Sequence, residues 1–392
     1  MSDWLIERSD LTNDQKKTVR LPFDGHTLVS GPMGAGKTVV CCHRAAYLIE
    51  NSGTAGKKLN IFAPTDVNLA FLRCGMAALG LNPEYAYTLN RWCRFFYRDH
   101  ISQTLPVVYL DGRVDDGKTR AGVLGLLRKR PDLGNNLDQV ILDDAQEFPP
   151  DVFEIMKRVS RKVHLLYDPD PSYFGRGTPE KKILDIFGLS ERSAVLRGDF
   201  RCPRILAGLA AMWIDERHKE YRDEFFGRLR STARGEMPVY FRADSPEDEM
   251  NRLADIVRQR EYLGDRIGIL VARPSLVHRL AGELAARGIE VEKAIVADAQ
   301  NVFHPPYDFG RITPKITTYE MGRGLTFDVI LMPCLTREAF QRLDDGRVRY
   351  KLFSGISRAR KWAHLSAVEG FEFMGYPLLK KAAAGGALII IP

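Results

Sequence analysis

The 392-residue sequence lacks the features that mark several classes of protein. Its six cysteines are scattered and form no C-x-x-C pair, which argues against a zinc site and a disulfide framework and favours reduced, mostly buried thiols. The N-terminus has no basic-then-apolar secretory signal. The one strongly apolar end, residues 387–391, is too short to span a bilayer and predicts a terminal strand or a docking tail. No internal repeat is present. These absences favour a cytoplasmic protein without a membrane partner.

The composition is that of an ordinary globular chain, with 45% hydrophobic and 27% charged residues. Its length predicts about two or three domains with sizeable cores. The formal net charge is +7 and the pI is near 9.0. Such a mild basic excess suits a polyanionic partner without requiring one.

A phosphate-binding motif lies between a predicted buried strand, ending at Val29, and a predicted helix. It reads G-x-x-x-x-G-K-T, with Gly31, Gly34, Gly36, Lys37 and Thr38 as the residues of interest. In this context the glycines let backbone N–H groups close around phosphates, and the helix N-terminus adds positive potential. We expect Lys37 to reach the β- and γ-phosphates and Thr38 to hold Mg²⁺. The alternative is a glycine-rich turn before an ordinary helix.

Gln15 lies one short segment before this motif. Thr12 and Gln15 have the spacing of a capping box, which predicts that a helix begins here. Gln15 either caps this helix and does no more, or it faces a purine, because one amide can donate to and accept from adenine at once.

Two adjacent carboxylates, Asp143 and Asp144, follow a second apolar run. Because the carboxyl ends of parallel strands line the ligand crevice of a sheet, we expect Asp143 to bind the water shell of Mg²⁺ and Asp144 to orient an attacking water. The alternative is a solvated turn at a strand end. Strands and helices alternate along the chain as far as these carboxylates and beyond, which predicts a doubly wound α/β domain.

Several other segments carry weaker signals. Residues 87–98 mix aromatics with arginines, and Trp92 suits either stacking on bases or packing in a core. Residues 101–136 are predicted to be a small irregular insertion, and residues 215–234 a solvated stretch rich in Glu and Arg. Near the C-terminus we expect a helix over residues 352–360 and a short strand over residues 364–366.

The order of these motifs resembles superfamily 1 helicases of the UvrD/Rep type over about residues 11–366. The matching stretches are residues 11–15 (glutamine motif), 31–38 (motif I), 63–65 (motif Ia), 88–90, 143–146 (motif II), 168–172 (motif III), 199–201 (motif IV), 318–328 (motif V) and 356–360 (motif VI). The resemblance implies an α/β fold of two tandem RecA-like domains, each a parallel sheet flanked by helices, over residues 1–195 and 196–392. It also implies that ATP binds between these domains.

The resemblance also implies roles for residues beyond the phosphate loop. Arg201 and Arg358 would reach the γ-phosphate, which suits the charge that develops on a transferring phosphoryl group. Gln15 would select adenine, the ring of Phe200 would lie near the base, and Arg323 would join the nucleotide-binding residues. Contacts to nucleic acid are implied for Thr65, Thr88, Asn90 and Thr318, and the aromatic and basic composition of residues 87–98 adds Trp92.

The sequence departs from the family pattern at several positions. Asp144 replaces the Glu of motif II, Pro171 the Gln of motif III, Pro64 an aromatic residue of motif Ia, and Glu320 and Thr326 the His and Glu of motif V. The accessory domains called 1B and 2B are reduced or missing. Most of these replacements affect residues that couple the ATP site to the nucleic-acid strand or contact that strand, whereas the phosphate-binding residues are kept. We therefore expect ATP binding more firmly than duplex unwinding.

Two functional hypotheses follow. The first is an ATP-dependent motor that translocates on single-stranded DNA, with RNA as the alternative strand and a protein partner for strand separation. The second is an ATP-gated switch or interaction subunit of a DNA repair or anti-phage defence complex, with weak hydrolysis and no unwinding of its own. Both place the protein in the cytoplasm, associated with the nucleoid if it is bacterial.

Overall fold

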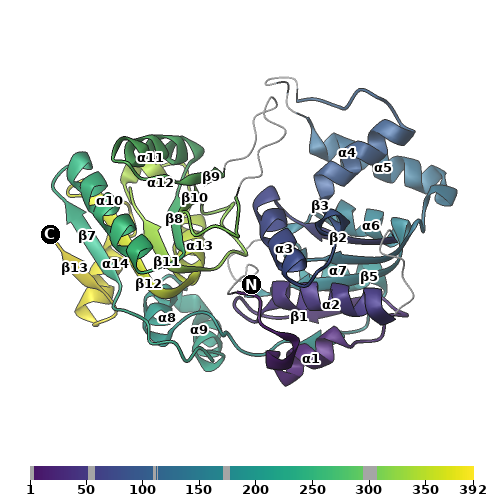
Figure 1. Ribbon diagram of the computed structural model, residues 1–392, viewed down its shortest axis with the longest axis horizontal. Coiled ribbons are helices and arrows are strands. Elements are labelled where there is room, and N and C mark those ends of the chain that lie inside the picture. The colour runs from purple at the N-terminus through teal and green to yellow at the C-terminus, as the bar shows by residue number, and fades with distance from the viewer. Residues whose placement is uncertain (1–3, 52–57, 109–111, 113, 171–176, 295–306) are drawn as a thin grey trace. The chain divides into compact units, whose positions relative to one another are not determined.

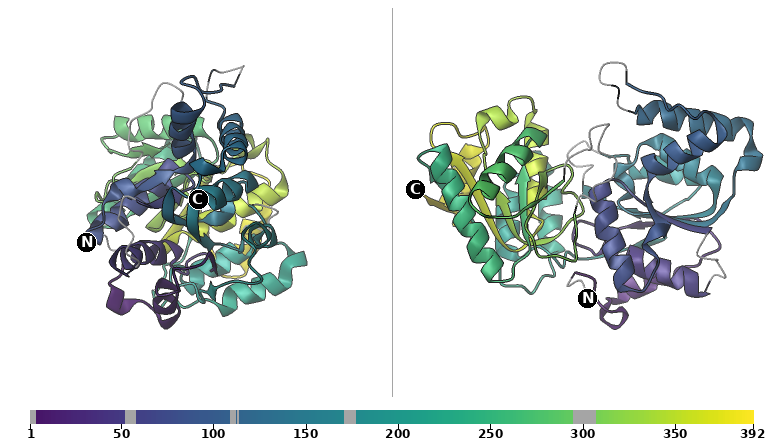
Figure 2. Two further views of the ribbon diagram at one scale, coloured as in Figure 1. Left: turned by 90° about the vertical axis from the view of Figure 1, so that its right-hand side faces the viewer. Right: turned by 45° about the horizontal axis from the view of Figure 1, so that its top comes forward.

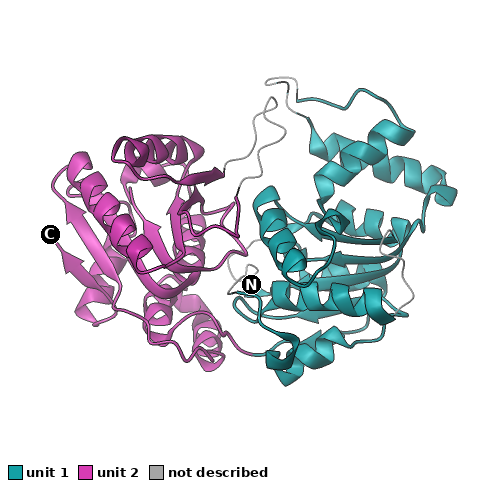
Figure 3. Cartoon of the chain, in the orientation of Figure 1, with its two compact units in different colours: residues 1–197, 297–305 teal, residues 198–296, 306–392 magenta. Residues whose placement is uncertain are grey.

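The computed structural model describes residues 4–392 except 52–57, 109–111, 113, 171–176 and 295–306. The chain divides into two compact units (Figure 3), which meet in the sequence at Arg197 and Gly198. Their described residues are 4–197 in unit 1 and 198–294 with 307–392 in unit 2. The sequence had predicted a boundary between residues 195 and 196. Pro171, one of the departures from the family pattern, lies outside the described residues.

Unit 1 is built on a parallel sheet with the strand order β3-β2-β4-β5-β1-β6 in its described part (Figure 1). The strands are β1 (Thr27–Ser30), β2 (Leu59–Ala63), β3 (Ala86–Thr88), β4 (Leu137–Leu142), β5 (Ser160–Tyr167) and β6 (Ala194–Val195). The helices are α1 (Asn13–Val19), α2 (Lys37–Asn51), α3 (Asp66–Ala78), α4 (Leu89–His100), α5 (Asp116–Lys129), α6 (Pro150–Val159) and α7 (Glu180–Phe187).

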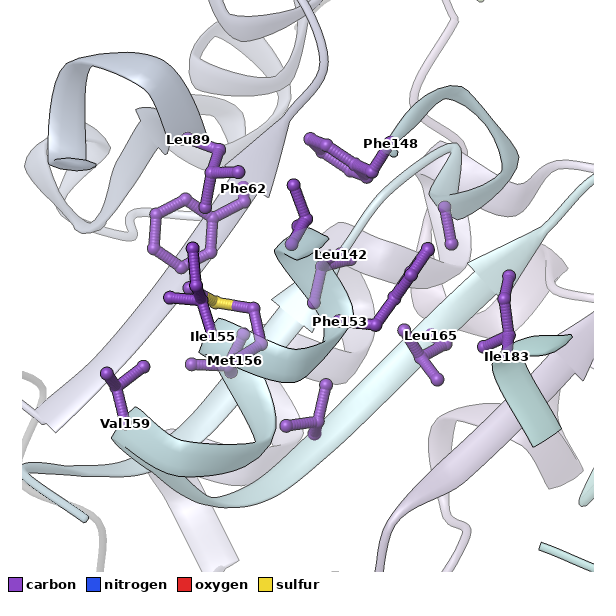
Figure 4. Close-up of a cluster of buried hydrophobic side chains, with 14 of the residues drawn as sticks. Phe62, Leu89, Leu142, Phe148, Phe153, Ile155, Met156, Val159, Leu165 and Ile183 are labelled. Atoms are coloured by element: carbon purple, nitrogen blue, oxygen red, sulfur yellow. The ribbon is translucent and has the colours of Figure 1, made fainter. Parts of the chain in front are cut away.

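Both faces of the unit 1 sheet are buried, as a parallel sheet requires. Successive residues of a strand point to opposite faces, so Leu28 joins the core that contains α6 and α7, whereas Val29 joins the core that contains α2 and α3. Figure 4 shows the first of these cores, in which Phe153 and Met156 of α6 lie among sheet residues such as Leu165. This packing fixes the strand ends that carry the predicted site.

Unit 2 has a parallel sheet with the order β13-β7-β12-β11-β8-β10-β9 in its described part. The strands are β7 (Val239–Ala243), β8 (Ile267–Val271), β9 (Glu292–Ala294), β10 (Lys315–Thr318), β11 (Phe327–Met332), β12 (Ala359–Val368) and β13 (Ile389–Ile391). The helices are α8 (Arg204–Ala211), α9 (Lys219–Gly227), α10 (Pro246–Tyr262), α11 (Pro274–Ala286), α12 (Arg337–Phe340), α13 (Asp345–Ile356) and α14 (Tyr376–Ala384).

Helices cover both faces of the unit 2 sheet as well (Figure 2). Val329 and Leu331 of β11 pack in one core with residues of α10 and α11. On the opposite face Met332 lies against Gly355 of α13, where a Cβ would come within 3.1 Å of the methionine Cε. The apolar end of the chain forms β13, which pairs in parallel with β7. The predicted terminal strand is therefore confirmed.

The prediction of an irregular insertion over residues 101–136 is wrong in its central part. Helix α5 occupies 14 of these residues, with the Asp115 side chain capping its N-terminus and Val123 and Leu127 buried. Its glycines concealed the helix in the sequence. Gly122 is there for packing, because a Cβ at this position would lie 2.7 Å from the ring of Tyr97 on α4.

Two predictions in the second half of the chain are also corrected. The stretch 215–234 contains α9, whose Tyr221 and Phe225 are buried and whose Arg228 lies over both rings. The helix predicted for residues 352–360 ends at Ile356, where the Ser357 hydroxyl donates to the carbonyl of Phe353 (2.8 Å). Strand β12 then begins at residue 359 and is longer than predicted. Among the described residues, no helix has the length and apolar character needed to cross a bilayer.

Candidate nucleotide site

The glycine-rich loop connects β1 to α2, as the sequence predicted. Gly34 and Gly36 have φ angles of 80° and 83°, in the left-handed region that side chains with a Cβ rarely adopt. The N–H of Gly31 donates to the carbonyl of Tyr167 at the end of β5 (2.9 Å), which anchors the loop to the neighbouring strand. The remaining loop backbone is thereby positioned at the N-terminus of a 15-residue helix, where an anion is favoured.

Lys37, the lysine of this loop, is 7% exposed and is fully engaged within unit 1. Its ammonium donates to the carbonyls of Gly31 (3.0 Å) and Pro32 (3.1 Å) and to Oδ2 of Asp168 (2.9 Å). An ammonium group has three donors, so all of them are used here. A phosphate that binds Lys37 must replace at least one of these partners.

Asp143 and Thr38 lie together beside the loop. The Thr38 hydroxyl donates to Oδ2 of Asp143 (2.8 Å), while Oδ1 of Asp143 is buried with no hydrogen-bond partner among the described residues. Burial, and next the neighbouring Asp144 carboxylate, raise the pKa of Asp143, against the lowering effects of Thr38 and Lys37. A buried carboxylate with an unused oxygen next to a hydroxyl is a donor set that fits Mg²⁺.

Asp144 follows in a left-handed backbone conformation, with φ 49° and ψ 51°. Gln146 connects it to β5, because its Nε2 lies 3.4 Å from Oδ1 of Asp144 and its Oε1 accepts from the N–H of Asp168 (2.9 Å). Both carboxylates of motif II are buried, so the alternative of a solvated turn is wrong.

Asp168 and Asp170 were not among the predicted site residues, although both contact the phosphate loop. Asp168 pairs with Lys37, and Oδ2 of Asp170 accepts from the N–H of Met33 (3.1 Å). A signal was present in the sequence, because acidic residues directly after a buried strand lie at the carboxyl edge of the sheet. What the sequence did not give is the strand order, which places β5 next to β1.

Gln15 is buried against the phosphate loop. Its Oε1 accepts from the N–H of Thr12 (2.9 Å), and its Nε2 donates to the carbonyl of Ala35 (3.0 Å). The capping box with Thr12 is complete. The contacts therefore support the helix-capping alternative and add a bond to the loop that the sequence did not predict.

Unit 2 carries the predicted arginines. Arg201 is 9% exposed, and its Nη1 lies 3.5 Å from both the Leu325 carbonyl and the Thr326 hydroxyl. Its Nε and Nη2 are buried with no hydrogen-bond partner among the described residues. The neighbouring Asp199 turns the backbone here, because its Oδ1 accepts from the N–H groups of Arg201 (2.9 Å) and Cys202 (3.1 Å).

The other predicted nucleotide-binding residues of unit 2 have varied surroundings. Arg358 is buried and donates to the Ser354 hydroxyl (3.2 Å), whereas the ring of Phe200 is 42% exposed. The Arg323 guanidinium lies over the ring of Tyr350 (5.4 Å).

Three of the residues predicted to contact nucleic acid have polar partners in their own unit. Thr65 caps α3 by accepting from the N–H of Asn68 (3.1 Å). Oδ1 of Asn90 accepts from Arg120 (3.1 Å), and the Thr318 hydroxyl accepts from the N–H of Met321 (3.4 Å). These bonds orient the side chains without excluding a further contact, because a hydroxyl or carbonyl oxygen can take part in more than one bond.

Thr88 and Trp92 lie at the start of α4. Thr88 is buried and forms no capping hydrogen bond through its side chain. Trp92 stacks on Phe96 (ring centroids 5.2 Å apart) and meets Phe62 edge to face (6.2 Å), at the margin of a hydrophobic core. The contacts of Trp92 support the core-packing alternative.

No family model matches this sequence, and no curated protein matches it. Among solved structures, Dbp5 of S. cerevisiae bound to RNA and ADP BeF3 has 13% sequence identity and a TM-score of 0.53, over 97% of this chain and 90% of that one. A substitution variant of Dbp5 with the same ligands gives 0.54 over the same shares. The chain has the fold of two tandem RecA-like domains. A likeness at this identity shows the fold alone.

Proposed function

We propose that the protein is an ATP-dependent nucleic-acid motor of the UvrD-like type, which translocates on single-stranded DNA. The observation that supports it most is the pairing of Thr38, in the first turn of α2, with Asp143, directly after β4. Thr38 and Asp143 are joined at 2.8 Å beside a phosphate loop, and one buried carboxylate oxygen is left for a cation. The Dbp5 structures, which hold RNA and ADP BeF3 on the same fold, add support for a nucleotide-dependent protein that binds nucleic acid.

In the proposed reaction each residue has a defined task. The loop N–H groups and Lys37 bind the phosphates, and Asp144 orients the attacking water. Thr38 and Asp143 would hold Mg²⁺, which when bound neutralises charge on the phosphate oxygens. Arg201 and Arg358 of unit 2 would stabilise the charge that develops on the γ-phosphoryl group.

Translocation follows if the nucleotide binds more tightly to one arrangement of the two units than to the other. Binding then favours that arrangement, hydrolysis releases it, and a strand held by both units is moved stepwise. The backbone contacts proposed for Thr65, Thr88, Asn90 and Thr318 would hold such a strand. They are compatible with DNA or RNA, because backbone contacts discriminate weakly between the two sugars.

The test is ATP turnover measured with single-stranded DNA, duplex DNA, RNA or no nucleic acid. We expect single-stranded DNA to raise turnover by about tenfold or more, and Lys37→Ala to abolish turnover. Lys182→Ala, on the exposed face of α7, is the matched control and should behave like the wild type. If turnover is the same with and without nucleic acid, the protein is not a nucleic-acid motor. If RNA raises turnover more than single-stranded DNA does, RNA is the strand on which it acts.

A second candidate function is an ATP-gated switch with weak hydrolysis, and two observations favour it. Lys37 is bound to Asp168 within its own unit, and Asp144 has a side chain one methylene shorter than the Glu of the family. The switch predicts tight ATP binding, very slow turnover, and faster turnover for Asp144→Glu. The left-handed backbone at this position should cost the Glu variant about 1 kcal/mol of stability, so thermal unfolding must be measured alongside. No gain in turnover would argue against the switch.

A further inference from the structure

The side-chain amide of Gln15 is held in one orientation by two bonds of opposite polarity. Its oxygen accepts from the N–H of Thr12, and its nitrogen donates to the carbonyl of Ala35 in the phosphate loop. Turning the amide over would set N–H against N–H and oxygen against oxygen. The side chain is only 4% exposed. The amide is therefore a fixed connection between the start of α1 and the loop.

The loop depends on this connection at its most constrained point. Ala35 lies between Gly34 and Gly36, the two loop residues with left-handed backbone. A Cβ at Gly36 would lie 2.5 Å from Nε2 of Gln15, so the amide packs directly on the loop backbone. Beyond the end of β5, Oδ2 of Asp170 accepts from the N–H of Met33 (3.1 Å). The loop is thus held from two sides, by a donor from Gln15 and by an acceptor from Asp170, and both bonds fix its backbone.

A glutamine that reads a base must present its carbonyl and its amino group together to the base edge. Here the two groups are directed at the backbone of Thr12 and of Ala35. One hydrogen of Nε2 and one lone pair of Oε1 remain, but the side chain is only 4% exposed, so a base edge can reach them only if the packing around the amide opens.

We infer that Gln15 is a positioning residue for the phosphate loop and does not select the base. The inference rests on the proposed function, because it assumes that the loop binds a nucleoside triphosphate. Gln15 then affects binding only through the phosphates. Replacing it should weaken the binding of all triphosphates by the same factor. Inorganic tripolyphosphate, which has no base, distinguishes the two roles.

Two variants separate the helix cap from the loop bond. Gln15→Glu keeps an acceptor for the N–H of Thr12, since Glu is the other residue of capping boxes, but sets an oxygen against the carbonyl of Ala35. Thr12→Ala removes the hydroxyl that caps the N–H of Gln15 and leaves the bond from Gln15 to Ala35. Thr12→Ala is therefore the control for loss of the cap alone.

The experiment measures the dissociation constants of ATP, GTP and tripolyphosphate, each with Mg²⁺, by titration calorimetry. We expect Gln15→Glu to weaken all three by the same factor, about five- to tenfold, and to leave the ratio of ATP to GTP affinity within about twofold of the wild type. Thr12→Ala should leave all three affinities nearly unchanged. In the protein without ligand, hydrogen exchange at the amides of residues 34–37 should be faster in Gln15→Glu than in Thr12→Ala.

Three results would overturn the inference. These are unchanged tripolyphosphate affinity in Gln15→Glu, a shift of the ATP-to-GTP ratio beyond about fivefold, or equal effects of the two variants. If the wild type binds none of the three compounds, the proposed function fails and the inference with it. If the wild type binds them but any of the first three results is found, only the inference fails.

Discussion

The buried polar groups of the two units are satisfied to different degrees. In unit 1 the Lys37 ammonium has three partners from its own unit, and the buried His164 ring is bonded through both nitrogens, to Thr27 (2.8 Å) and Gln139 (2.7 Å). In unit 2 two nitrogens of Arg201 and both ring nitrogens of His364 are buried without a hydrogen-bond partner among the described residues.

The difference has energetic consequences. A ligand that binds Lys37 must exchange existing bonds, so its net gain is reduced by the ion pair that it breaks. A phosphate that reaches Arg201 instead satisfies donors whose burial already costs free energy. A buried polar group without a hydrogen-bond partner therefore indicates function where a ligand can supply the missing bond. Where no ligand does so, the group destabilises the folded protein.

The largest effect is expected for Arg201→Met, which removes the guanidinium and keeps most of the side-chain volume. If Arg201 stabilises the transferring phosphoryl group, the turnover number should fall by about 10³-fold. ATP affinity should change little, because the interaction is made mainly in the transition state. Steady-state kinetics with single-stranded DNA would measure this. Arg204→Met, exposed on α8 nearby in the sequence, is the control. A change confined to KM would contradict the assignment.

The next effect concerns the ion pair between Lys37 and Asp168. Asp168→Asn should tighten ATP binding by about tenfold, because the nucleotide no longer competes with a carboxylate for the ammonium group. The same variant should unfold at a lower temperature without nucleotide, since a buried ammonium group loses its charged partner. Saturating ATP should therefore give a larger thermal shift than in the wild type.

Asp185→Asn, exposed on α7, controls for the loss of one negative charge. It should leave both the affinity and the unfolding temperature near the wild-type values. Weaker ATP binding by Asp168→Asn, with normal binding by the control, would show that Asp168 helps to hold the nucleotide and does not compete with it.

The sequence predicted the parts of the fold that depend on local chemistry. The glycine loop, the cap at Thr12 and the parallel α/β pattern all follow from residues close in the chain, and the structure has them. Helix α5 was missed because three glycines lower its helix propensity, whereas its stability comes from packing on α4. The residues that set this packing are far apart in the sequence.

The candidate site was predicted as a set of residues but not as a set of contacts. Lys37, Thr38 and Asp143 belong to motifs whose spacing is visible in the sequence. The bond from Lys37 to Asp168 depends on which strand lies next to β1, and the bond from Gln15 to Ala35 depends on how α1 packs against the loop. No local pattern encodes either of these. The choice between the two roles of Gln15 therefore needed the structure.

The smallest effect is expected at His364, whose two buried ring nitrogens have no hydrogen-bond partner among the described residues. Burial, with Arg252 and Arg260 nearby, lowers its pKa to about 3. The ring is therefore neutral in the folded protein, whereas in the unfolded chain it binds a proton below about pH 6.5. Because the unfolded state binds more protons, stability should fall as the pH drops through 6.5, and by pH 5.5 the loss from this group is about 1.4 kcal/mol.

His364→Phe should remove this loss, because a phenyl ring can pack beside Trp362 and Phe241 and takes up no proton. Urea unfolding, monitored by hydrogen exchange at β12, should show the variant more stable than the wild type at pH 7.5, because two unpaired buried nitrogens are removed. The gain should be about 1.4 kcal/mol larger at pH 5.5. His164→Phe is the corresponding variant in unit 1. It leaves the side chains of Thr27 and Gln139 without their histidine partner, so it should destabilise unit 1 at both pH values. If His364→Phe and His164→Phe change stability equally, the unpaired histidine of unit 2 destabilises its unit no more than the paired histidine of unit 1. The difference between the two units would then depend on Arg201 alone.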